Sequence, residues 1–150
     1  MNKKWHAIYT KENCEKKVSE LLTKKRVSNY CPLNYIIKPN KIGNLSKHLE
    51  ILLPSIVFVY IEEENKNEIL TINGVINFIY WRDKELVIPH IEIDNLQHFL
   101  NDYYNIEFDT KKNKPNNLIQ KQKNISKIRL PSLGYILFSN ENCKINSVKI

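Results

Sequence analysis

The side chains best suited to bind another molecule are the lysines of residues 11–26, KENCEKKVSELLTKKR. Within this segment Cys14, Val18, Leu21 and Leu22 recur at helical spacing, which predicts an amphipathic helix. The lysines fall mostly off this apolar stripe and form a basic outer face. Such a face attracts polyanions, above all the backbone of a nucleic acid.

The distribution of charge along the chain supports this interpretation. The net charge is +7, from 23 basic and 16 acidic residues. Residues 1–30 carry a net charge of +5, residues 31–100 a net charge of −3, and residues 101–150 a net charge of +5. A basic N-terminal segment beside an acidic middle suggests one face that binds a polyanion. A solvated, lysine-rich surface without a ligand is the alternative.

A second unusual feature is the apolar run of residues 52–60, LLPSIVFVY. In an extended strand, Val57 and Val59 point to one face while Ile56 and Phe58 point to the other. A half-buried strand alternates between apolar and polar residues, and this one does not. Both faces must therefore be covered, either by the chain itself or by a partner.

The elements that position these residues follow from periodicity and turn signals. We expect strands at 5–10, 29–39, 48–62, 75–81 and 85–89, and helices at 11–26, 63–72 and 90–104. Pro32 interrupts the second strand, and Pro54 marks a bulge or an edge in the third. The order predicts an α+β fold, the ferredoxin-like split βαβ sandwich. In this fold the helices cover one face of the sheet and the other face stays open.

Residues 1–107 form this predicted domain, residues 108–117 (FDTKKNKPNN) read as a polar linker, and residues 118–150 read as short strands. The candidate strands are LIQKQ, ISKIRLP and YILFS. Three short strands are too few for an independent core.

The sequence indicates no enzyme, metal site or cofactor. It contains no GxGxxG, Walker A, HExxH or GxSxG motif, and Cys14, Cys31 and Cys143 have no CxxC spacing. An acylphosphatase of the same fold needs an arginine after the first strand, where this chain has Thr10-Lys11-Glu12. With no long apolar stretch and no secretion signal, we expect a cytoplasmic protein with no membrane partner.

The order of segments along the chain resembles the N-terminal domain of the NusG family of transcription elongation factors. The segments are WHAIYTK, a basic helix, YCPL, LLPSIVFV, GVINFIYW, LVIP and an amphipathic helix. The resemblance covers roughly residues 4–105. It is greatest to the specialised UpxY and RfaH-like paralogues, which act on long surface-polysaccharide operons. The most specific motifs are LLPSIVFV, which looks like L-F-P-x-Y-x-F-V, and GVINFIYW, which looks like G-V-x-x-F-V. This chain has Leu53 where the family has Phe, and Ile56 where it usually has an aromatic residue.

The resemblance implies two binding surfaces. The open apolar face would bind the clamp helices of the RNA polymerase largest subunit, and the basic helix would contact the non-template DNA strand. The implied polymerase-binding residues are Leu53, Pro54, Ile56, Phe58, Phe78 and Tyr80. The implied nucleic-acid-binding residues are Lys11, Lys17, Lys24, Lys25 and Asn73. Asn65, Lys66 and Asn67 match a second polymerase contact in relatives.

The C-terminal segment resembles the last part of the family's KOW (SH3-like) barrel, with LPSLGY typical of UpxY-like proteins. The first strand of the barrel and its Gly-rich turn are missing, so a contact with the ribosome or a termination factor is not expected. The leading hypothesis is an operon-specific antitermination factor that suppresses pausing. The alternatives are an RNA-binding module of the RRM type, although the RNP1 pattern is missing, and a degenerate, inactive relative.

Overall fold

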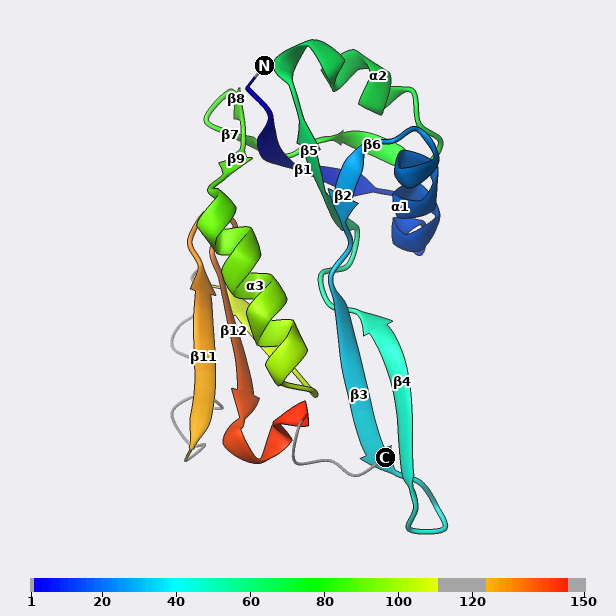
Figure 1. Ribbon diagram of the computed structural model, residues 1–150, viewed down its shortest axis with the longest axis vertical. Helices are drawn as coiled ribbons and strands as arrows, with labels where there is room; N and C mark the ends of the chain where they lie inside the picture. The colour runs from blue at the N-terminus through cyan, green and yellow to red at the C-terminus, as the bar shows by residue number, and fades with distance from the viewer. Residues whose placement is uncertain (1, 111–123, 146–150) are drawn as a thin grey trace. The chain divides into compact units, whose positions relative to one another are not determined.

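The computed structural model describes residues 2–110 and 124–145, which fall into two compact units (Figure 1). The first unit comprises Met1–Pro32 and Leu53–Ile91, and the second comprises Leu33–Leu52 and Glu92–Ile150. No helix in the described part of the chain is long and apolar enough to cross a membrane.

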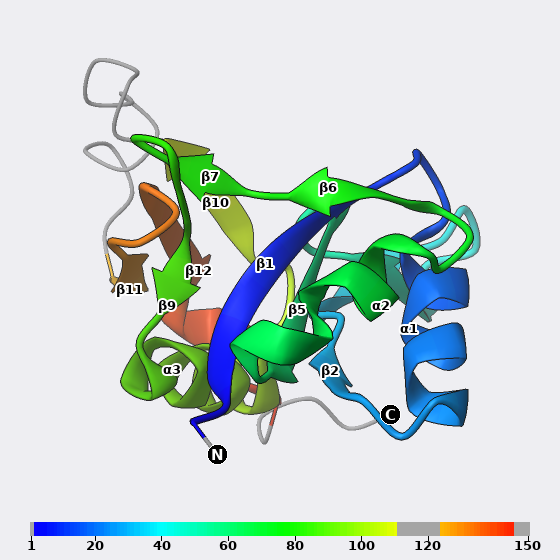
Figure 2. The ribbon, with the colours of Figure 1, turned by 90° about the horizontal axis from the view of Figure 1, so that it is seen from above.

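The first unit contains the predicted split βαβ arrangement (Figure 2). Its helices are α1 (Glu15–Lys24) and α2 (Lys66–Leu70), the latter preceded by a 3-10 turn at Glu63–Asn65. Its main strands are β1 (Lys4–Thr10), β2 (Ser28–Tyr30), β5 (Ile56–Ile61) and β6 (Val75–Phe78), in the antiparallel order β2-β5-β1-β6. Because β1 and β2 both run antiparallel to β5, they are parallel to each other with β5 inserted between them. This confirms the predicted α+β, ferredoxin-like fold.

The register divides the sheet into two faces. Ile8 lies opposite both Val57 and Phe78, so these three side chains share a face. They belong to the core cluster that also contains Val18 of α1 and Ile69 of α2. This helix-side face is therefore the hydrophobic core of the unit. On the opposite face, which we call the β5 face, the cross-strand pairs are Trp5 with Tyr60, Ala7 with Phe58, and Tyr9 with Ile56.

Two strands that the sequence predicted as continuous are each divided between two sheets. The segment 29–39 forms β2 and then β3 (Leu33–Pro39), and the segment 48–62 contains the end of β4 (Leu45–Ile51) and then β5. Pro54 has no N–H to donate, and Ser55 has a φ of 63°, so no ladder continues through them. The hydrophobic pattern does not reveal this break, because the apolar residues on both sides of it, Leu52 and Leu53 before and Ile56 and Val57 after, are all buried.

Beyond β6, the chain forms a small hairpin of β7 (Tyr80–Trp81) and β8 (Lys84–Glu85), and then β9 (Val87–Ile88), which pairs with β1. The predicted strand 75–81 is thus interrupted at Ile79. The turn of this hairpin consists of Arg82 and Asp83, both in the left-handed region.

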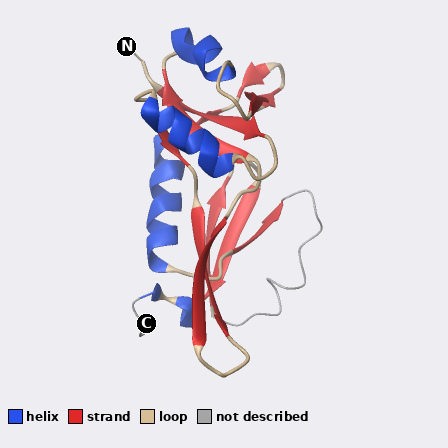
Figure 3. Ribbon diagram, turned by 90° about the vertical axis from the view of Figure 1, so that its right-hand side faces the viewer, coloured by secondary structure: helices blue, strands red, loops and turns tan. Residues whose placement is uncertain are grey.

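The second unit contains a two-stranded ribbon of β3 and β4, which is drawn in red among the strands of Figure 3. It also contains a three-stranded sheet in the order β10-β12-β11. The sheet consists of β10 (Glu107–Thr110), β11 (Ile125–Leu130) and β12 (Tyr135–Asn140), followed by a 3-10 turn at Glu141–Cys143. Helix α3 (His90–Asp102) begins in the first unit and continues in the second. Ser139 of β12 donates to the carbonyl oxygen of Tyr104 just beyond α3, at 2.7 Å.

The strands predicted from ISKIRLP and YILFS are confirmed as β11 and β12, whereas LIQKQ lies outside the described residues. The first three residues of the predicted linker 108–117 belong to β10 instead, which corrects that part of the interpretation. This short strand was hidden by its polar composition, and Phe108 supplies its one aromatic contact, with the ring of Tyr135 at 5.4 Å. The domain boundaries and the KOW origin of this segment stay predictions.

Candidate binding surfaces

The five predicted nucleic-acid-binding residues all lie in the first unit and are all exposed. We call Lys11, Lys17, Lys24, Lys25 and Asn73 the α1 surface, because they lie on α1 or beside its ends. The helix buries Val18 and Leu22 in the core, which turns the lysines outwards. Their exposure suits contact with a polyanion and equally suits solvation.

The turn that carries Asn73 is fixed against the start of α1. Gly74 has a φ of +100°, and a Cβ atom at this position would lie 2.8 Å from Cγ2 of Val18. The carbonyl oxygen of Gly74 accepts a hydrogen bond from the backbone N–H of Lys11 at 2.8 Å. Glycine is therefore required both for the left-handed backbone and for the close approach. Lys11 and Asn73, which are distant in sequence, are thereby neighbours in the fold.

Arg26 extends the α1 surface, and the sequence analysis missed it. It is exposed and directly follows Lys24 and Lys25 at the C-terminal end of α1. Its φ is 62°, and its backbone N–H donates to the carbonyl oxygen of Thr23 at 2.9 Å. The run KKR was the signal that could have indicated it. A left-handed residue just beyond the end of a helix is usually glycine, so the arginine at this position has a more strained backbone than glycine would have.

Arg26→Gly is expected to raise the free energy of unfolding by about 1 kcal/mol relative to Arg26→Ala, because only glycine relieves the left-handed strain. Denaturant unfolding followed by circular dichroism measures this difference. Both variants remove the same positive charge, so they should weaken binding to single-stranded DNA equally. Equal stabilities of the two variants would show that Arg26 does not adopt this backbone conformation.

Four of the six predicted polymerase-binding residues are buried, namely Phe78, which is described below, and three residues in or just before β5. Leu53, Ile56 and Phe58 expose 1%, 5% and 1% of their surface, respectively. Within the first unit, the ring of Tyr30 on β2 stacks on Phe58 with the centroids 6.3 Å apart. The sequence predicted these positions for a polymerase contact on an apolar face covered by the chain itself or by a partner, and that assignment stays a prediction. A partner contacts these three side chains only if they become exposed.

The placement of Phe78 on the same face was wrong. Phe78 lies opposite Ile8 and belongs to the helix-side core. The pairing of β6 with β1 shifts between Tyr9 and Thr10, so the face of each β6 residue follows from the register and not from simple alternation. Tyr80 lies beyond the break, on the β7–β8 hairpin, and is 49% exposed. Pro54 is exposed as well.

Tyr9 is the exposed aromatic residue on the β5 face that the sequence analysis missed. It lies opposite Ile56 and is 45% exposed. The alternation in WHAIYT, which places Trp5, Ala7 and Tyr9 on one side, was the available signal. An exposed tyrosine beside buried apolar residues is a suitable anchor for a protein interface.

A buried carboxylate joins the β5 face to α1. Glu15, in the first turn of α1, is 4% exposed, and its Oε2 accepts a hydrogen bond from the backbone N–H of Ser55 at 3.2 Å. The backbone N–H of Thr10 donates to the carbonyl oxygen of Ser55 at 2.9 Å. The turn that carries Pro54 is therefore tied both to β1 and to the helix that carries the lysines.

The three residues predicted for a second polymerase contact lie at the start of α2. Asn65 and Asn67 are exposed, but the side chain of Lys66 is only 12% exposed. Its Nζ contacts Oε1 of Glu63 at 2.5 Å and Oε2 of Glu85 at 3.0 Å. Burial opposes the charged form of Lys66, but the hydrogen bonds to both carboxylates outweigh it and raise its pKa. Lys66 therefore fastens the β7–β8 hairpin to α2.

His6 lies beside this ion-pair network and is 2% exposed. Its Nδ1 is buried and has no hydrogen-bond partner within residues 2–110 and 124–145. Burial, together with the charges of Lys66 and Lys4, lowers its pKa below 6.5, although Glu63 and Glu85 act in the opposite direction. The folded protein therefore favours neutral His6.

The free energy of unfolding is expected to fall as the pH decreases below 6.5, because the unfolded state then binds a proton that folded His6 does not. The slope is at most about 1.4 kcal/mol per pH unit and ends at the pKa of the folded state. Denaturant unfolding between pH 7 and 5 should show this loss in the wild type and in His98→Gln, which changes an exposed histidine, but not in His6→Leu. Glu85 titrates below this window, since the hydrogen bond from Lys66 lowers its pKa from 4.5. The same slope in all three proteins would contradict the assignment.

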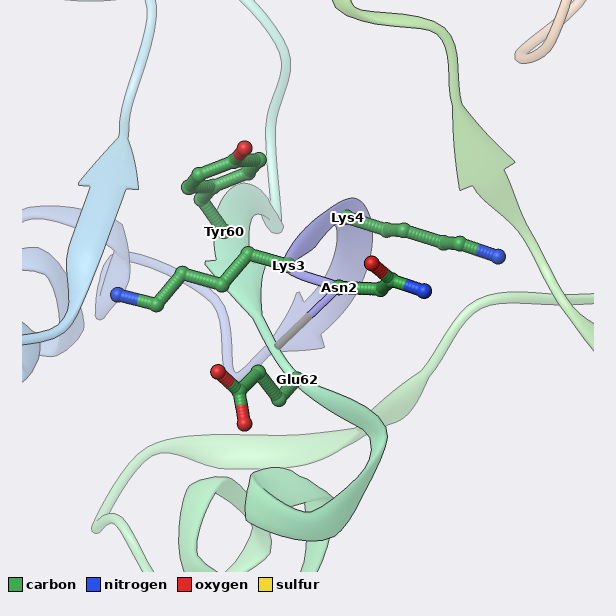
Figure 4. Close-up of a pocket in the computed structure, with 5 residues that line it drawn as sticks. All are labelled: Asn2, Lys3, Lys4, Tyr60 and Glu62. Carbon is green, nitrogen blue, oxygen red and sulfur yellow. The ribbon is translucent and has the colours of Figure 1, made fainter.

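The surface also has a depression of about 600 Å³, lined by Asn2, Lys3, Lys4, Tyr60 and Glu62 (Figure 4). The side chains of the two lysines point in different directions in this view, and the carboxylate of Glu62 lies below them. No cluster of three or more metal-ligating side chains occurs in the described part of the chain.

These features define a ferredoxin-like domain with a basic helix and a second sheet face that carries an exposed tyrosine. Residues 3–97 match the family model described as "Transcription termination factor nusG". Because this match covers more than half of the chain, the protein belongs to the NusG family.

The chain is similar to the solved structure described as "Domain interaction in Thermotoga maritima NusG", with 23% sequence identity and a TM-score of 0.45. The similarity covers 65% of this chain and 57% of that chain, so the protein spans little more than half of the length of that relative. The comparison with curated proteins finds no match.

Proposed function

We propose that the protein is a transcription elongation and antitermination factor that binds the clamp helices of RNA polymerase and contacts the non-template DNA strand in the cytoplasm. It acts as a specialised paralogue of the UpxY and RfaH type on surface-polysaccharide operons, and it is not an enzyme. Membership of the NusG family supports the general role. No contact with the ribosome or a termination factor is proposed.

The observation that carries this proposal is the connection between the two candidate surfaces. Glu15 and Thr10 tie the turn at Ser55 to α1 and to β1, so the turn that leads into β5 is linked directly to the helix that carries the lysines. A factor that holds polymerase on one surface and DNA on the other favours the closed, elongating state of the enzyme, because it binds that state better than the open state.

The RRM alternative is disfavoured by burial. An RRM stacks bases on exposed aromatic rings of its sheet. Here Phe58, on a central strand of the sheet, is 1% exposed, and its ring stacks on that of its cross-strand neighbour Tyr30. The exposed residues at this site, Tyr9 and Pro54, suit contact with a protein partner better than the stacking of successive bases.

Tyr9→Glu is expected to lower affinity for purified RNA polymerase by roughly tenfold or more, because it places a charge at a contact anchor. Val87→Glu is the matched control. Val87 is 43% exposed, close to the 45% of Tyr9, but lies opposite His6 and so on the helix side of the sheet. Biolayer interferometry with immobilised polymerase measures both, after circular dichroism has shown that both are folded. Equal affinity of the two variants would overturn the assignment of the β5 face.

A further inference from the structure

The β3–β4 ribbon of the second unit has no role in the function proposed above. Its two strands pair over seven positions, from Leu33 with Ile51 to Pro39 with Leu45. Neither strand pairs with a third strand among the described residues (Figure 3). An isolated two-stranded ribbon is marginal in water, so its persistence needs an anchor at the base.

Asparagine side chains provide that anchor. Asn34 donates to the carbonyl oxygen of Ile106 at 2.8 Å and accepts from its backbone N–H at 3.1 Å. In the same way Asn105 accepts from the backbone N–H of Ile37 at 2.8 Å and donates to its carbonyl oxygen at 2.9 Å. The base is thus bonded as if to a third strand, while residues 38–50 are exposed.

The tip of the ribbon is well formed and apolar. Oδ1 of Asn40 accepts hydrogen bonds from the backbone N–H groups of Ile42 and Asn44, at 3.0 and 2.9 Å. This loop presents Ile42 with 85% of its surface exposed, the largest fraction among the exposed large apolar residues of the described chain. Leu45 beside it is 57% exposed.

Lysines surround this apolar tip. Lys38, Lys41 and Lys47 lie in the distal segment 38–49, which contains no acidic residue. Lys47 Nζ lies 4.4 Å from the centre of the Tyr35 ring, which directs it along the ribbon. Glu50, the acidic residue of the ribbon, pairs with His48 at 2.9 Å. The distal segment therefore has a charge of +3 that no carboxylate of the ribbon neutralises.

We propose that the distal β3–β4 ribbon is a second nucleic-acid contact, which enters the minor groove of duplex DNA and wedges Ile42 between base pairs. Two-stranded ribbons fit DNA grooves, with lysines on the phosphates. Apolar wedges such as Ile, Leu and Pro at the tip unstack a base step and kink the duplex. The charge complementarity of three lysines around an apolar tip favours this ligand over a neutral protein surface. The proposal rests on the proposed function, since a transcription complex contains duplex DNA.

The test uses the full chain and a 30-base-pair duplex with a dye at each end, without polymerase. Binding of the wild type is expected to bring the two ends closer and raise energy transfer. Ile42→Ser should abolish this increase and weaken binding about fivefold, but leave the salt dependence unchanged, because no phosphate contact is lost. Ile76→Ser is the control, since Ile76 is 60% exposed in the first unit.

The triple variant Lys38→Gln, Lys41→Gln and Lys47→Gln should lower the magnitude of the slope of log affinity against log salt by about 2.7. This value assumes that each lysine contacts one phosphate of the duplex and that each contact contributes roughly 0.9 to the slope. An unchanged slope, or a bend of the duplex that persists in Ile42→Ser, would overturn the proposal.

Loss of binding of the triple variant to phosphatidylserine vesicles, with duplex binding intact, would assign the ribbon to a membrane instead. Loss of polymerase binding alone would make it a protein contact. Because the duplex assay contains no polymerase, a wild type that fails to bind polymerase refutes the proposed function without deciding this result.

Discussion

Phe58→Asp is expected to unfold the protein and not merely to disable an interface. Phe58 is 1% exposed, stacks on Tyr30 and lies opposite Ala7 on a central strand. Removing a buried Phe side chain costs about 3–5 kcal/mol, and an unpaired buried carboxylate costs more. The whole stability of a domain of this size is about 5–15 kcal/mol. Circular dichroism and denaturant unfolding should therefore show a largely unfolded variant.

Phe58→Leu is the matched control for this prediction. It keeps an apolar side chain at the same position, so it should cost only about 1–2 kcal/mol and leave the fold intact. If Phe58→Asp folds with an unfolding midpoint close to that of the wild type, Phe58 is exposed to water in solution. That result would contradict the buried β5 face and restore the open face that the sequence predicted.

Replacing Lys17, Lys24 and Lys25 with glutamine is the second change with a large expected effect. If each lysine contacts one phosphate, the slope of log affinity against log salt for single-stranded DNA should fall by about 2, at roughly 0.7 for each contact. Affinity at low salt should fall by about tenfold or more. Fluorescence anisotropy with a labelled oligonucleotide over a salt series measures both quantities.

The control for this variant changes the same number of charges elsewhere. Lys3, Lys84 and Lys127 are exposed and lie outside the α1 surface, so their replacement with glutamine lowers the net charge equally. A matching decrease in both triple variants would mean that general electrostatic attraction, and not the α1 surface, binds the DNA.

The order of elements in the first unit could be predicted from the sequence because each signal is local. The alternation of WHAIYT and the helical spacing of Val18 and Leu22 each predict a nearby element. These elements then fit one known arrangement, the split βαβ unit. The exposure of the α1 lysines follows from the same helical periodicity.

Exposure and face assignment on the sheet could not be predicted in this way, because they depend on pairing between distant segments. The face of Phe78 is set by its register with Ile8 on β1, which includes an irregularity beside Tyr9. The division of the apolar run at Ser55 depends on which strands find partners on either side. The bond from Ser55 to Glu15, forty residues away, likewise has no sequence signal.

The most direct test of the proposed function is the dwell time of RNA polymerase at a defined pause on a template with an intact non-template strand. The wild type is expected to shorten the dwell, whereas Tyr9→Glu and the triple lysine variant of α1 each lose this effect and Val87→Glu retains it. A dwell time that is the same with and without the folded wild-type protein, at concentrations that saturate polymerase, would contradict the account.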